Sequence, residues 1–513
     1  MNIYKSLFLG LVCSAGMHCT FAQTTVWNPD NQNGTFTNPI MWGDWPDPDL
    51  IRVDDKFYLV STSMHYVPGC PIAVSEDLVN WEMAGYALDR YDEDPKYDMQ
   101  GGNLYLNGAW ATTIRHHNGK FYVGFCTPYG WGRETGHFSI CIADDVKGPW
   151  ERTIFPEYLY DPGLFFDEDG KVYVVHGQGT LYLTELNSDV KSVKGKPVKI
   201  WQGGFKNAHE LGGGFGMEGS HMYRINGKYY ITCPAGGTGG WQICLRSDNI
   251  YGPYEHKLIM NDWSSYPKNG LHQGGMVQLK NGDWWFMIMQ DRGPIGRVPC
   301  LVPVKWIDGW PMLGDKDGHI PNDTTLSYMS MDGICGSDDF SASGLSLYWQ
   351  WNHNPVDQAW SLTDRPGFLR LKTSRVVDNL FVAPNTLTQR MVGPKCMGTV
   401  SLSLGGMKDG DRAGLSAFNG DSGVLTIEKN GNKLSLVMSE QKSVFEKTKR
   451  AISRVDMTEQ ARIPLNKELV YLRVEGDFTN GRDEARFSYS LDGKTWLPVG
   501  LPIKMKFDYT RMF

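Results

Sequence analysis

Short strand patterns punctuated by glycine, asparagine and aspartate run through the first 310 residues, and long amphipathic helical periodicity is nearly absent. A tight polar turn followed by aromatic or β-branched residues recurs five times, at intervals of 51 to 64 residues. The five copies are Asp55-Lys56-Phe57-Tyr58, Gly119-Lys120-Phe121-Tyr122, Gly170-Lys171-Val172-Tyr173, Gly227-Lys228-Tyr229-Tyr230 and Gly282-Asp283-Trp284-Trp285. Repeats of this length in an all-β chain predict a five-bladed β-propeller rather than a solenoid. The innermost strand of each blade would then line a common axis.

A second sequence element recurs out of phase with the first. Its three copies are Ser75-Glu76-Asp77-Leu78-Val79-Asn80-Trp81, Ala143-Asp144-Asp145-Val146-Lys147-Gly148-Pro149-Trp150 and Arg246-Ser247-Asp248-Asn249-Ile250-Tyr251-Gly252-Pro253-Tyr254.

The pattern changes after a connector at 307–336 that is rich in Asp, Gly, Pro and Met. Alternating strand patterns at 369–373, 423–428 and 469–474, joined by Asn-Gly and Asp-Gly turns, then predict a second all-β domain, most simply a sandwich. We therefore predict a propeller at 24–330 and a β-sandwich at 331–513. Because the chain stops in mid-pattern at Arg511-Met512-Phe513, we expect that a final strand or two is missing.

The N-terminus is typical of an export signal at 1–22. Lys5 supplies the positive charge, 7–15 the short apolar core, and Thr20-Phe21-Ala22 a cleavage site. The apolar run is too short to span a bilayer, which predicts a secreted or periplasmic protein without membrane insertion.

Composition narrows the classes of partner. At 513 residues the chain is long enough for two domains, and with a net charge of -7 and no basic run interleaved with aromatics, nothing favours a nucleic-acid partner. Aromatic residues make up 12% of the chain, which suits sugar stacking, although core packing is their commoner use. The eight cysteines beyond the signal are scattered, and we expect Cys126, Cys233 and Cys300 to be buried free thiols rather than disulfide or zinc residues.

Three carboxylates stand out among many ordinary turn acids. The first is Asp47, which lies between two prolines in the stretch Gly43-Asp44-Trp45-Pro46-Asp47-Pro48-Asp49, ahead of a strand pattern. Asp161 again precedes a proline at the start of an apolar strand, and Glu218 follows a glycine-rich run that leaves room for a ligand. Glycoside hydrolysis needs one protonated and one ionised carboxyl group beside the same bond, and a third nearby carboxylate would tune the acid. An acidic surface turn remains the alternative for each of them.

Several motifs, in order over about residues 36 to 310, resemble glycoside hydrolase family 43. They are Asn38-Pro39-Ile40 with Trp45-Pro46-Asp47-Pro48-Asp49, Val67-Pro68-Gly69-Cys70-Pro71-Ile72, Gly108-Ala109-Trp110-Ala111-Thr112-Thr113-Ile114-Arg115, Tyr160-Asp161-Pro162-Gly163, Met217-Glu218-Gly219-Ser220-His221-Met222-Tyr223 and Gly296-Arg297 with Leu301-Val302-Pro303-Val304. The tail resembles the β-sandwich of the β-xylosidase and α-L-arabinofuranosidase branch.

The resemblance implies a five-bladed propeller and an inverting reaction. It implies that Asp47 is the general base, Glu218 the general acid, and Asp161 the residue that tunes and orients Glu218. Asp44 and Asp49 would be supporting residues.

The resemblance also implies substrate-binding roles for Trp110, as the aromatic wall of the sugar pocket, and Arg297, as a ligand of sugar hydroxyls. We assign His272 to substrate binding as well. Trp110 could instead fill a blade core, and Arg297 could make a structural ion pair. His272 matches a histidine that accompanies a calcium site, so a structural calcium near it is one expectation, with no cofactor required for the reaction.

This sequence departs from the family pattern at two places. Val298-Pro299 follow Gly296-Arg297 where the family usually has Glu-Thr. His65 and Tyr66 stand in place of an acidic-aromatic pair, so we expect a different pocket rim.

The resulting hypothesis is an exo-acting, inverting glycosidase that releases terminal arabinose or xylose from an oligo- or polysaccharide of the plant cell wall, such as arabinoxylan. Packing alone discriminates two such similar sugars by only about 1–3 kcal/mol, which leaves the choice between them open. The alternatives are a non-catalytic glycan-binding propeller and a retaining fructan-type glycosidase.

Overall fold

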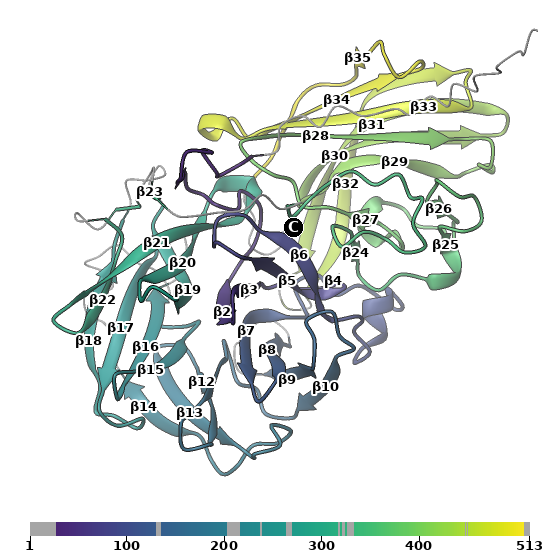
Figure 1. The fold of residues 1–513 in the computed structure, drawn as a ribbon. Helices are drawn as coiled ribbons and strands as arrows, with labels where there is room; N and C mark the ends of the chain where they lie inside the picture. The colour runs from purple at the N-terminus through teal and green to yellow at the C-terminus, as the bar shows by residue number, and fades with distance from the viewer. Residues whose placement is uncertain are drawn as a thin grey trace, which may run out of the picture.

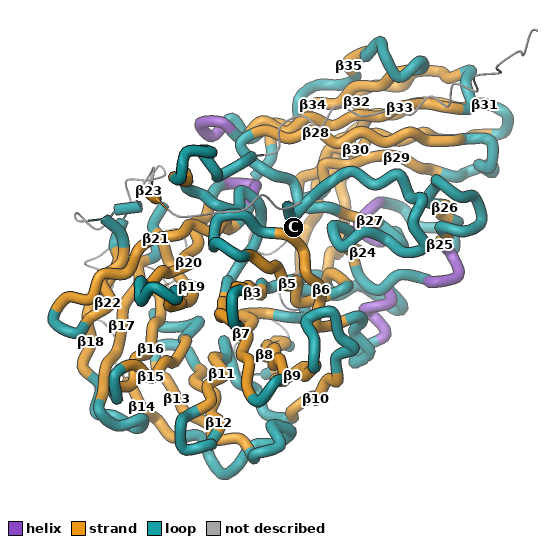
Figure 2. Tube along the Cα trace, in the orientation of Figure 1, coloured by secondary structure: helices purple, strands orange, loops and turns teal. Residues whose placement is uncertain are grey.

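The structure is a computed structural model, and it describes residues 27–129, 135–202, 216–235, 239–262, 269–315, 319–320, 324–325, 333–446, 448 and 450–506. The described residues contain strands, turns and short 3-10 helices but no α-helix, which confirms the all-β prediction (Figure 2). The 3-10 helices are Pro95–Asp98, Gly293–Ile295, Asp357–Ala359, Leu380–Val382 and Thr479–Gly481. None of these is long and apolar enough to cross a bilayer.

Three sequence predictions fall outside the described residues. They are the export signal at 1–22, the domain boundary at 330–331 and the missing final strand or two at 511–513.

Five four-stranded antiparallel sheets form the N-terminal half of the described chain. The first two sheets consist of β2 (Asp49–Val53), β3 (Lys56–Val60), β5 (Gly69–Ser75) and β6 (Glu82–Leu88), then β7 (Trp110–His117), β8 (Lys120–Pro128), β9 (Gly136–Ala143) and β10 (Glu151–Phe155). The third consists of β11 (Gly163–Phe166), β12 (Val172–His176), β13 (Thr180–Leu186) and β14 (Val198–Gln202). The last two consist of β15 (His221–Ile225), β16 (Lys228–Ala235), β17 (Trp241–Ser247) and β18 (Glu255–Met260), then β19 (Leu271–Gln278), β20 (Trp284–Asp291), β21 (Arg297–Ile307) and β22 (Trp310–Leu313).

These sheets form a ring, because the first strand of each contacts its neighbours (Figure 1). Strand β2 contacts β7 and β19, and β11 contacts β7 and β15. Strand β19 contacts β16 and β17 of the fourth sheet, which closes the ring. The innermost strands therefore bring residues from distant parts of the sequence to one centre.

The repeated turns of the sequence occupy equivalent places in the five sheets. Each copy of the first element forms the turn between the first and second strands of its sheet and the start of the second strand. The copies of the second element connect the third and fourth strands of the first, second and fourth sheets.

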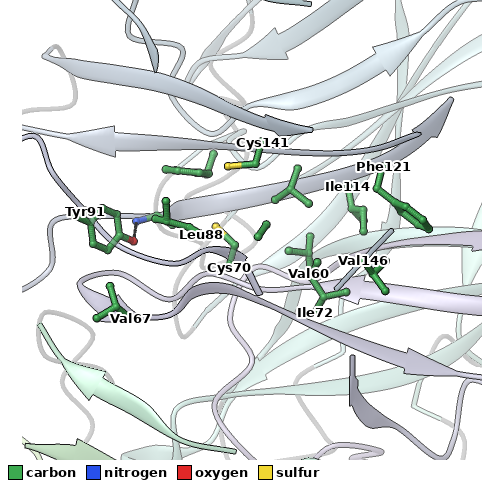
Figure 3. Packing of buried hydrophobic residues seen from close by; sticks show 14 of the residues in the cluster. Val60, Val67, Cys70, Ile72, Leu88, Tyr91, Ile114, Phe121, Cys141 and Val146 are labelled. Carbon is green, nitrogen blue, oxygen red and sulfur yellow. Dashed lines mark hydrogen bonds between the residues drawn. The ribbon is translucent and has the colours of Figure 1, made fainter. Parts of the chain in front are cut away.

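Apolar side chains fill the spaces between neighbouring sheets. Between the first and second sheets, Val60 and Ile72 pack toward Ile114, Phe121 and Cys141 (Figure 3). Removing such side chains from water stabilises the fold by roughly 1.5–3 kcal/mol each. Cys126, Cys233 and Cys300 are buried and free, as predicted.

The C-terminal sandwich consists of two packed sheets. One contains β28 (Lys395–Ser403), β33 (Leu469–Asp477), β34 (Glu484–Ser490), β35 (Leu497–Pro498) and β36 (Ile503–Lys504), and the other β29 (Arg412–Ala417), β30 (Asp421–Asn430), β31 (Lys433–Glu446) and β32 (Ala451–Leu465). Leu425 and Leu436 of one sheet share a core with Leu472 and Phe487 of the other. The predicted strands at 423–428 and 469–474 lie in β30 and β33.

The predicted strand at 369–373 is shorter than expected and lies outside both sandwich sheets. Only Arg370–Leu371 is a strand, β26, and it pairs with β25 (Trp360–Ser361). The remaining short strands are β1 (Thr35–Phe36), β4 (Tyr66–Val67), β23 (Thr324–Thr325), β24 (Gln350–Asn352) and β27 (Leu387–Thr388). Because β24 pairs with both β4 and β27, the segment that precedes the sandwich is hydrogen-bonded to the ring.

Candidate active site

Asp47 lies just before β2 with both carboxylate oxygens held in place. Arg297 Nη1 donates to Asp47 Oδ1 at 2.7 Å, and the Thr62 hydroxyl donates to Asp47 Oδ2 at 2.7 Å. The side chain is almost fully buried. Each carboxylate oxygen can accept a second hydrogen bond, so a carboxylate oriented in this way can still accept one from a water molecule.

Asp161 and Glu218 lie at the starts of adjacent innermost strands. Asp161 precedes β11, which begins at Gly163, and Glu218 precedes β15. A Cβ atom on Gly163 would lie 2.0 Å from the carbonyl oxygen of Ser220, so only glycine permits these two chain segments to approach so closely. The predicted tuning residue and the predicted acid are therefore carried by chain segments in direct contact.

Left-handed backbone conformations occur at this end of all five innermost strands. The residues and their φ angles are Asp47 (53°), Ala111 (46°), Asp161 (50°), Met217 (45°) and Gln273 (55°). Strands β7 and β19 also carry register shifts at this end. Such conformations cost of order 1–3 kcal/mol each and are maintained only where the surrounding structure enforces them. Their effect is to redirect side chains at the strand ends toward the centre of the ring.

Arg297, the first residue of β21, links several carboxylates. Besides its bond to Asp47, its Nε lies 3.7 Å from Asp291 Oδ1. Burial opposes the charge of the guanidinium, but Asp47, Asp291, Asp44 and Glu218 outweigh it and raise the pKa of Arg297 above its ordinary value. The charges of Asp47, the predicted base, and Glu218, the predicted acid, therefore both stabilise the positive charge of Arg297.

Asp44 holds the backbone of Arg297 through a hydrogen bond. It accepts the Arg297 backbone N–H at 2.8 Å, and a side chain at Gly296 would collide with it. Burial raises the pKa of Asp44 to about 6, although Arg297 and Arg390 oppose the shift.

Glu218 is partly exposed and receives two side-chain hydrogen bonds on one oxygen. The Tyr160 hydroxyl donates to Glu218 Oε2 at 3.2 Å, and Gln178 Nε2 donates to the same oxygen at 2.7 Å. Gln178 lies between Gly177 and Gly179 in the turn from β12 to β13. These bonds fix the orientation of the carboxyl group.

Asp49 has a structural environment, as the sequence analysis predicted. Its fully buried Oδ2 accepts bonds from Thr113 Oγ1 at 2.8 Å, from the Ile114 N–H at 3.0 Å and from Arg115 Nη1 at 2.6 Å. Burial would raise the pKa of Asp49, but Arg115, His221 and these donors lower it below the ordinary value. The carboxylate thereby joins β2 to β7.

Trp110 is partly exposed at the start of β7, next to these residues. Its indole N–H donates to the Leu106 carbonyl at 2.5 Å. Its own carbonyl accepts a contact from the Cys126 thiol at 3.8 Å, and burial, followed by the charges of Asp161 and Asp47, raises the pKa of that thiol. The next residue, Ala111, donates its N–H at 2.8 Å to the Thr62 hydroxyl that holds Asp47, which places Trp110 next to the support of the predicted base.

His272 is buried at the start of β19, where its Nε2 lies 3.7 Å from Asp291 Oδ1. Calcium binds six to eight oxygen ligands, and Asp291 is the carboxylate that the structure places beside this histidine. Asp291 also faces Arg297, whose positive charge opposes a cation there. No group of three or more His, Cys, Asp or Glu side chains that could hold a metal ion occurs among the described residues. The residues described here therefore do not fit a protein-built calcium shell, and the calcium site stays a prediction.

Sequence reasoning assigned no role to several side chains of this site. Thr62 and Gln178 position Asp47 and Glu218, and Arg450 of the C-terminal sandwich lies 4.8 Å above the Trp110 ring. The glycines on both sides of Gln178 were a usable signal, since a polar residue in such a turn can approach a ligand closely. For Arg450 the sequence contains no comparable signal.

His65 and Tyr66, the pair expected to change the pocket rim, are both buried, and their effect on the rim stays a prediction. His65 is fully buried, its Nε2 lies 3.0 Å from Asn352 Oδ1, and its Nδ1 accepts the Leu106 N–H at 3.3 Å. The residue contributes to the contact between the ring and the segment before the C-terminal sandwich.

Two family models together match most of the chain. Residues 36–311 match glycosyl hydrolases family 43, and residues 337–512 match a beta-xylosidase C-terminal concanavalin A-like domain.

Named relatives cover both matched regions. A beta-xylosidase from Formosa agariphila is 30% identical over 93% of this chain and 86% of its own length. A non-reducing end alpha-L-arabinofuranosidase from Bacteroides ovatus is 32% identical over 79% of this chain and 78% of its own.

Solved structures agree with this relationship. A bifunctional family 43 protein from Bacteroides eggerthii superimposes with a TM-score of 0.83 at 38% identity over 93% of this chain, which spans 60% of that protein's length. An engineered family 43 enzyme with endo-xylanase and exo-arabinofuranosidase activity gives a TM-score of 0.83 at 28% identity, with 93% of this chain and 94% of that one covered. The match over more than half of the chain and the relatives at 30% identity or more establish that the protein belongs to glycoside hydrolase family 43.

Proposed function

We propose that this protein is an exo-acting inverting glycoside hydrolase that releases terminal pentoses, α-linked L-arabinofuranose or β-linked D-xylose, from plant cell-wall polysaccharides such as arabinoxylan. The observation that carries the proposal is the convergence of Asp47, Asp161 and Glu218 at the starts of three innermost strands, with Arg297 acting on both Asp47 and Glu218. The names of the relatives support the substrate class.

Asp47 is the general base in this proposal. Its two fixed hydrogen bonds hold the carboxylate in one orientation, which allows it to take a proton from a water molecule that attacks the anomeric carbon. Glu218 is the general acid and donates its proton to the leaving oxygen. Inversion predicts that the two carboxyl groups lie roughly 6.5–9.5 Å apart, which leaves room for the water.

Asp161 orients Glu218 and favours its protonated form by like-charge repulsion. Trp110 supplies an aromatic face for the sugar, and Arg297 contacts sugar hydroxyls while it holds Asp47. His272, which shares Asp291 with Arg297, completes the proposed set of substrate-binding residues. No step of the reaction uses a metal ion.

For the fold, we propose that the five sheets are the blades of a five-bladed β-propeller spanning 24–330, followed by a β-sandwich at 331–513. The ring of strand contacts and the recurrence of one turn at the same place in each sheet support this arrangement. We also propose that residues 1–22 direct export to the periplasm or the exterior, where the polysaccharide is found.

The Glu218→Gln variant tests the assignment of the acid. With arabinoxylan oligosaccharides as substrates, whose sugar alkoxide needs a proton to leave, removing the acidic proton should lower kcat by about 10²–10⁴-fold and leave sugar binding measurable by calorimetry. The matched control is Glu157→Gln, an exposed carboxylate to which the proposal assigns no role. Full activity in the Glu218 variant would show that another group donates the proton.

Product analysis separates the remaining alternatives. NMR of the released sugar should show the inverted anomer first, whereas a retaining fructan-type enzyme would give the retained one. A glycan-binding propeller without activity would bind arabinoxylan oligosaccharides but release no pentose from them. The same panel of oligosaccharides shows whether arabinose, xylose or both are released.

A further inference from the structure

The hairpin that joins β31 to β32 extends from the C-terminal sandwich to the ring. Near its tip, the Ile452 N–H donates to Asn103 Oδ1 at 2.9 Å, and Asn103 Nδ2 donates back to the Ile452 carbonyl at 3.3 Å. Phe445, on the other strand of the hairpin, packs against the cluster of Met64, Leu106 and Trp110. The hairpin is thus bound to the loop that leads into β7 and to the predicted sugar platform.

Arg450 lies at the tip of this hairpin and is 3% exposed. Its guanidinium carbon is 4.8 Å from the centroid of the Trp110 ring, which is the geometry of a cation–π contact. Burial, the largest effect, lowers the pKa of Arg450, while the nearby hydroxyls of Tyr158 and Tyr160 oppose this effect. The Tyr160 hydroxyl is the one that donates to Glu218.

We propose that Arg450 is a positioning residue of the pentoside site, by which the C-terminal sandwich fixes the sugar platform Trp110 and the Tyr160–Glu218 pair from outside the ring. This inference rests on the proposed function and deepens it. Trp110 stays partly exposed beside this guanidinium, so part of the indole is available to the sugar. The sandwich would therefore determine how tightly a terminal pentose binds.

The physical consequence is an effect on substrate affinity. Removing a guanidinium from water costs free energy, so a buried guanidinium destabilises a protein unless its contacts offset that cost. A partly desolvated cation–π contact of about 0.5–2 kcal/mol corresponds to roughly a 2- to 30-fold change in an equilibrium constant. Because the platform contacts the sugar before and during reaction, its displacement weakens both states and raises KM more than it lowers kcat.

The test compares Arg450→Met and Arg450→Lys with the control Arg454→Met. Arg454 lies on the same hairpin, is exposed, and pairs with Asp456 at 2.8 Å. With 4-nitrophenyl α-L-arabinofuranoside and β-D-xyloside as substrates, Arg450→Met should raise KM roughly 2- to 30-fold, with a smaller change in kcat. Arg450→Lys should recover part of the affinity because it retains the positive charge, and Arg454→Met should behave as the wild type.

Unfolding curves of the same preparations separate positioning from stability. If Arg450 only stabilises the fold, its loss lowers the melting temperature and the active fraction, hence the apparent kcat, but leaves KM unchanged, and that result would overturn the proposal. An unchanged KM in a fully stable Arg450→Met variant would overturn it as well. A wild-type enzyme that hydrolyses neither pentoside would instead refute the proposed function, and this inference with it.

Discussion

Lowering the pH from 8 to 5 should destabilise the contact between the ring and the segment that precedes the C-terminal sandwich, through His65 and its partner His353. Both rings accept a backbone N–H, from Leu106 at 3.3 Å and from Leu104 at 3.0 Å, so the accepting nitrogen of each must be unprotonated. The opposite nitrogens face Asn352 Oδ1 at 3.0 and 3.3 Å. Protonation of either histidine would place a second donor against a backbone N–H.

The magnitude follows from the linkage between protonation and folding. Burial lowers the pKa of His65 to about 3 from 6.5, and the pKa of His353 lies well below 6.5 because of burial and the neighbouring His65. At pH 5 an unfolded imidazole is about 97% protonated while His65 remains neutral. Because the pKa is lower in the folded state, its contribution to stability is present above pH 6.5 and is lost as the pH falls. Linkage gives a loss of about 2 kcal/mol at pH 5 and about 3 kcal/mol at pH 4 for His65 alone.

Urea unfolding of the wild type and of His65→Gln at pH 8 and pH 5 measures this effect. Glutamine can accept the Leu106 N–H and donate to Asn352 but does not titrate, so the variant should lose about 2 kcal/mol less than the wild type between the two pH values. His116→Gln, the same exchange at an exposed position, is the control for the substitution itself. An equal loss in the wild type and in His65→Gln would refute the reasoning.

Three further predictions concern the acids and the arginine of the site. Asp49→Ala should destabilise the protein by about 3–5 kcal/mol in urea unfolding, because it leaves Arg115 buried without its partner; a loss below 1 kcal/mol would contradict this role. Asp44→Asn should stabilise the protein at pH 8 by up to about 3 kcal/mol and much less at pH 4. The reason is that a carboxyl group whose pKa is raised to about 6 destabilises the fold only where it is ionised. A stabilisation that does not depend on pH would contradict this prediction. Arg297→Lys should lower kcat/KM at least about tenfold without loss of stability, because one ammonium cannot reproduce the guanidinium geometry; wild-type kinetics would show that the geometry is unimportant.

The repeated turns could be predicted because they depend on local chemistry. The Gly-Lys pairs at 119, 170 and 227 each form a hairpin turn, and glycine at positive φ followed by strand residues is a signal within a few neighbouring residues. The strand predicted at 369–373 is shorter than expected for the opposite reason. Its alternation is typical of a strand, but only Arg370–Leu371 finds a partner, because pairing depends on chain elsewhere in the sequence.

In the candidate site, too, the residues with a local sequence signal could be predicted, and those whose contacts depend on packing could not. Asp47 and Asp161 could be predicted because a proline follows each, and both share a left-handed conformation that the surrounding turn enforces. Glu218 was found in the same way, from its glycine-rich setting. Gln178 and Arg450 were missed because their contacts depend on how sheets and domains pack. The contact between His65 and Asn352 could not be predicted for the same reason, because nothing in the sequence around His65 indicates it.

The C-terminal sandwich contributes to the site at more than one point. Ile295 and Val298, on either side of Arg297, are buried in the sandwich core with Leu425 and Leu472. The arginine that holds Asp47 is therefore flanked by residues whose burial requires the second domain. His65 makes a second link, because it contacts Asn352 of the segment before the sandwich and accepts the N–H of Leu106, which lies shortly before Trp110 in the chain. The geometry of the active site therefore depends on the domain interface. A ring without the sandwich would expose these apolar side chains and lose the support that fixes Arg297 against Asp47.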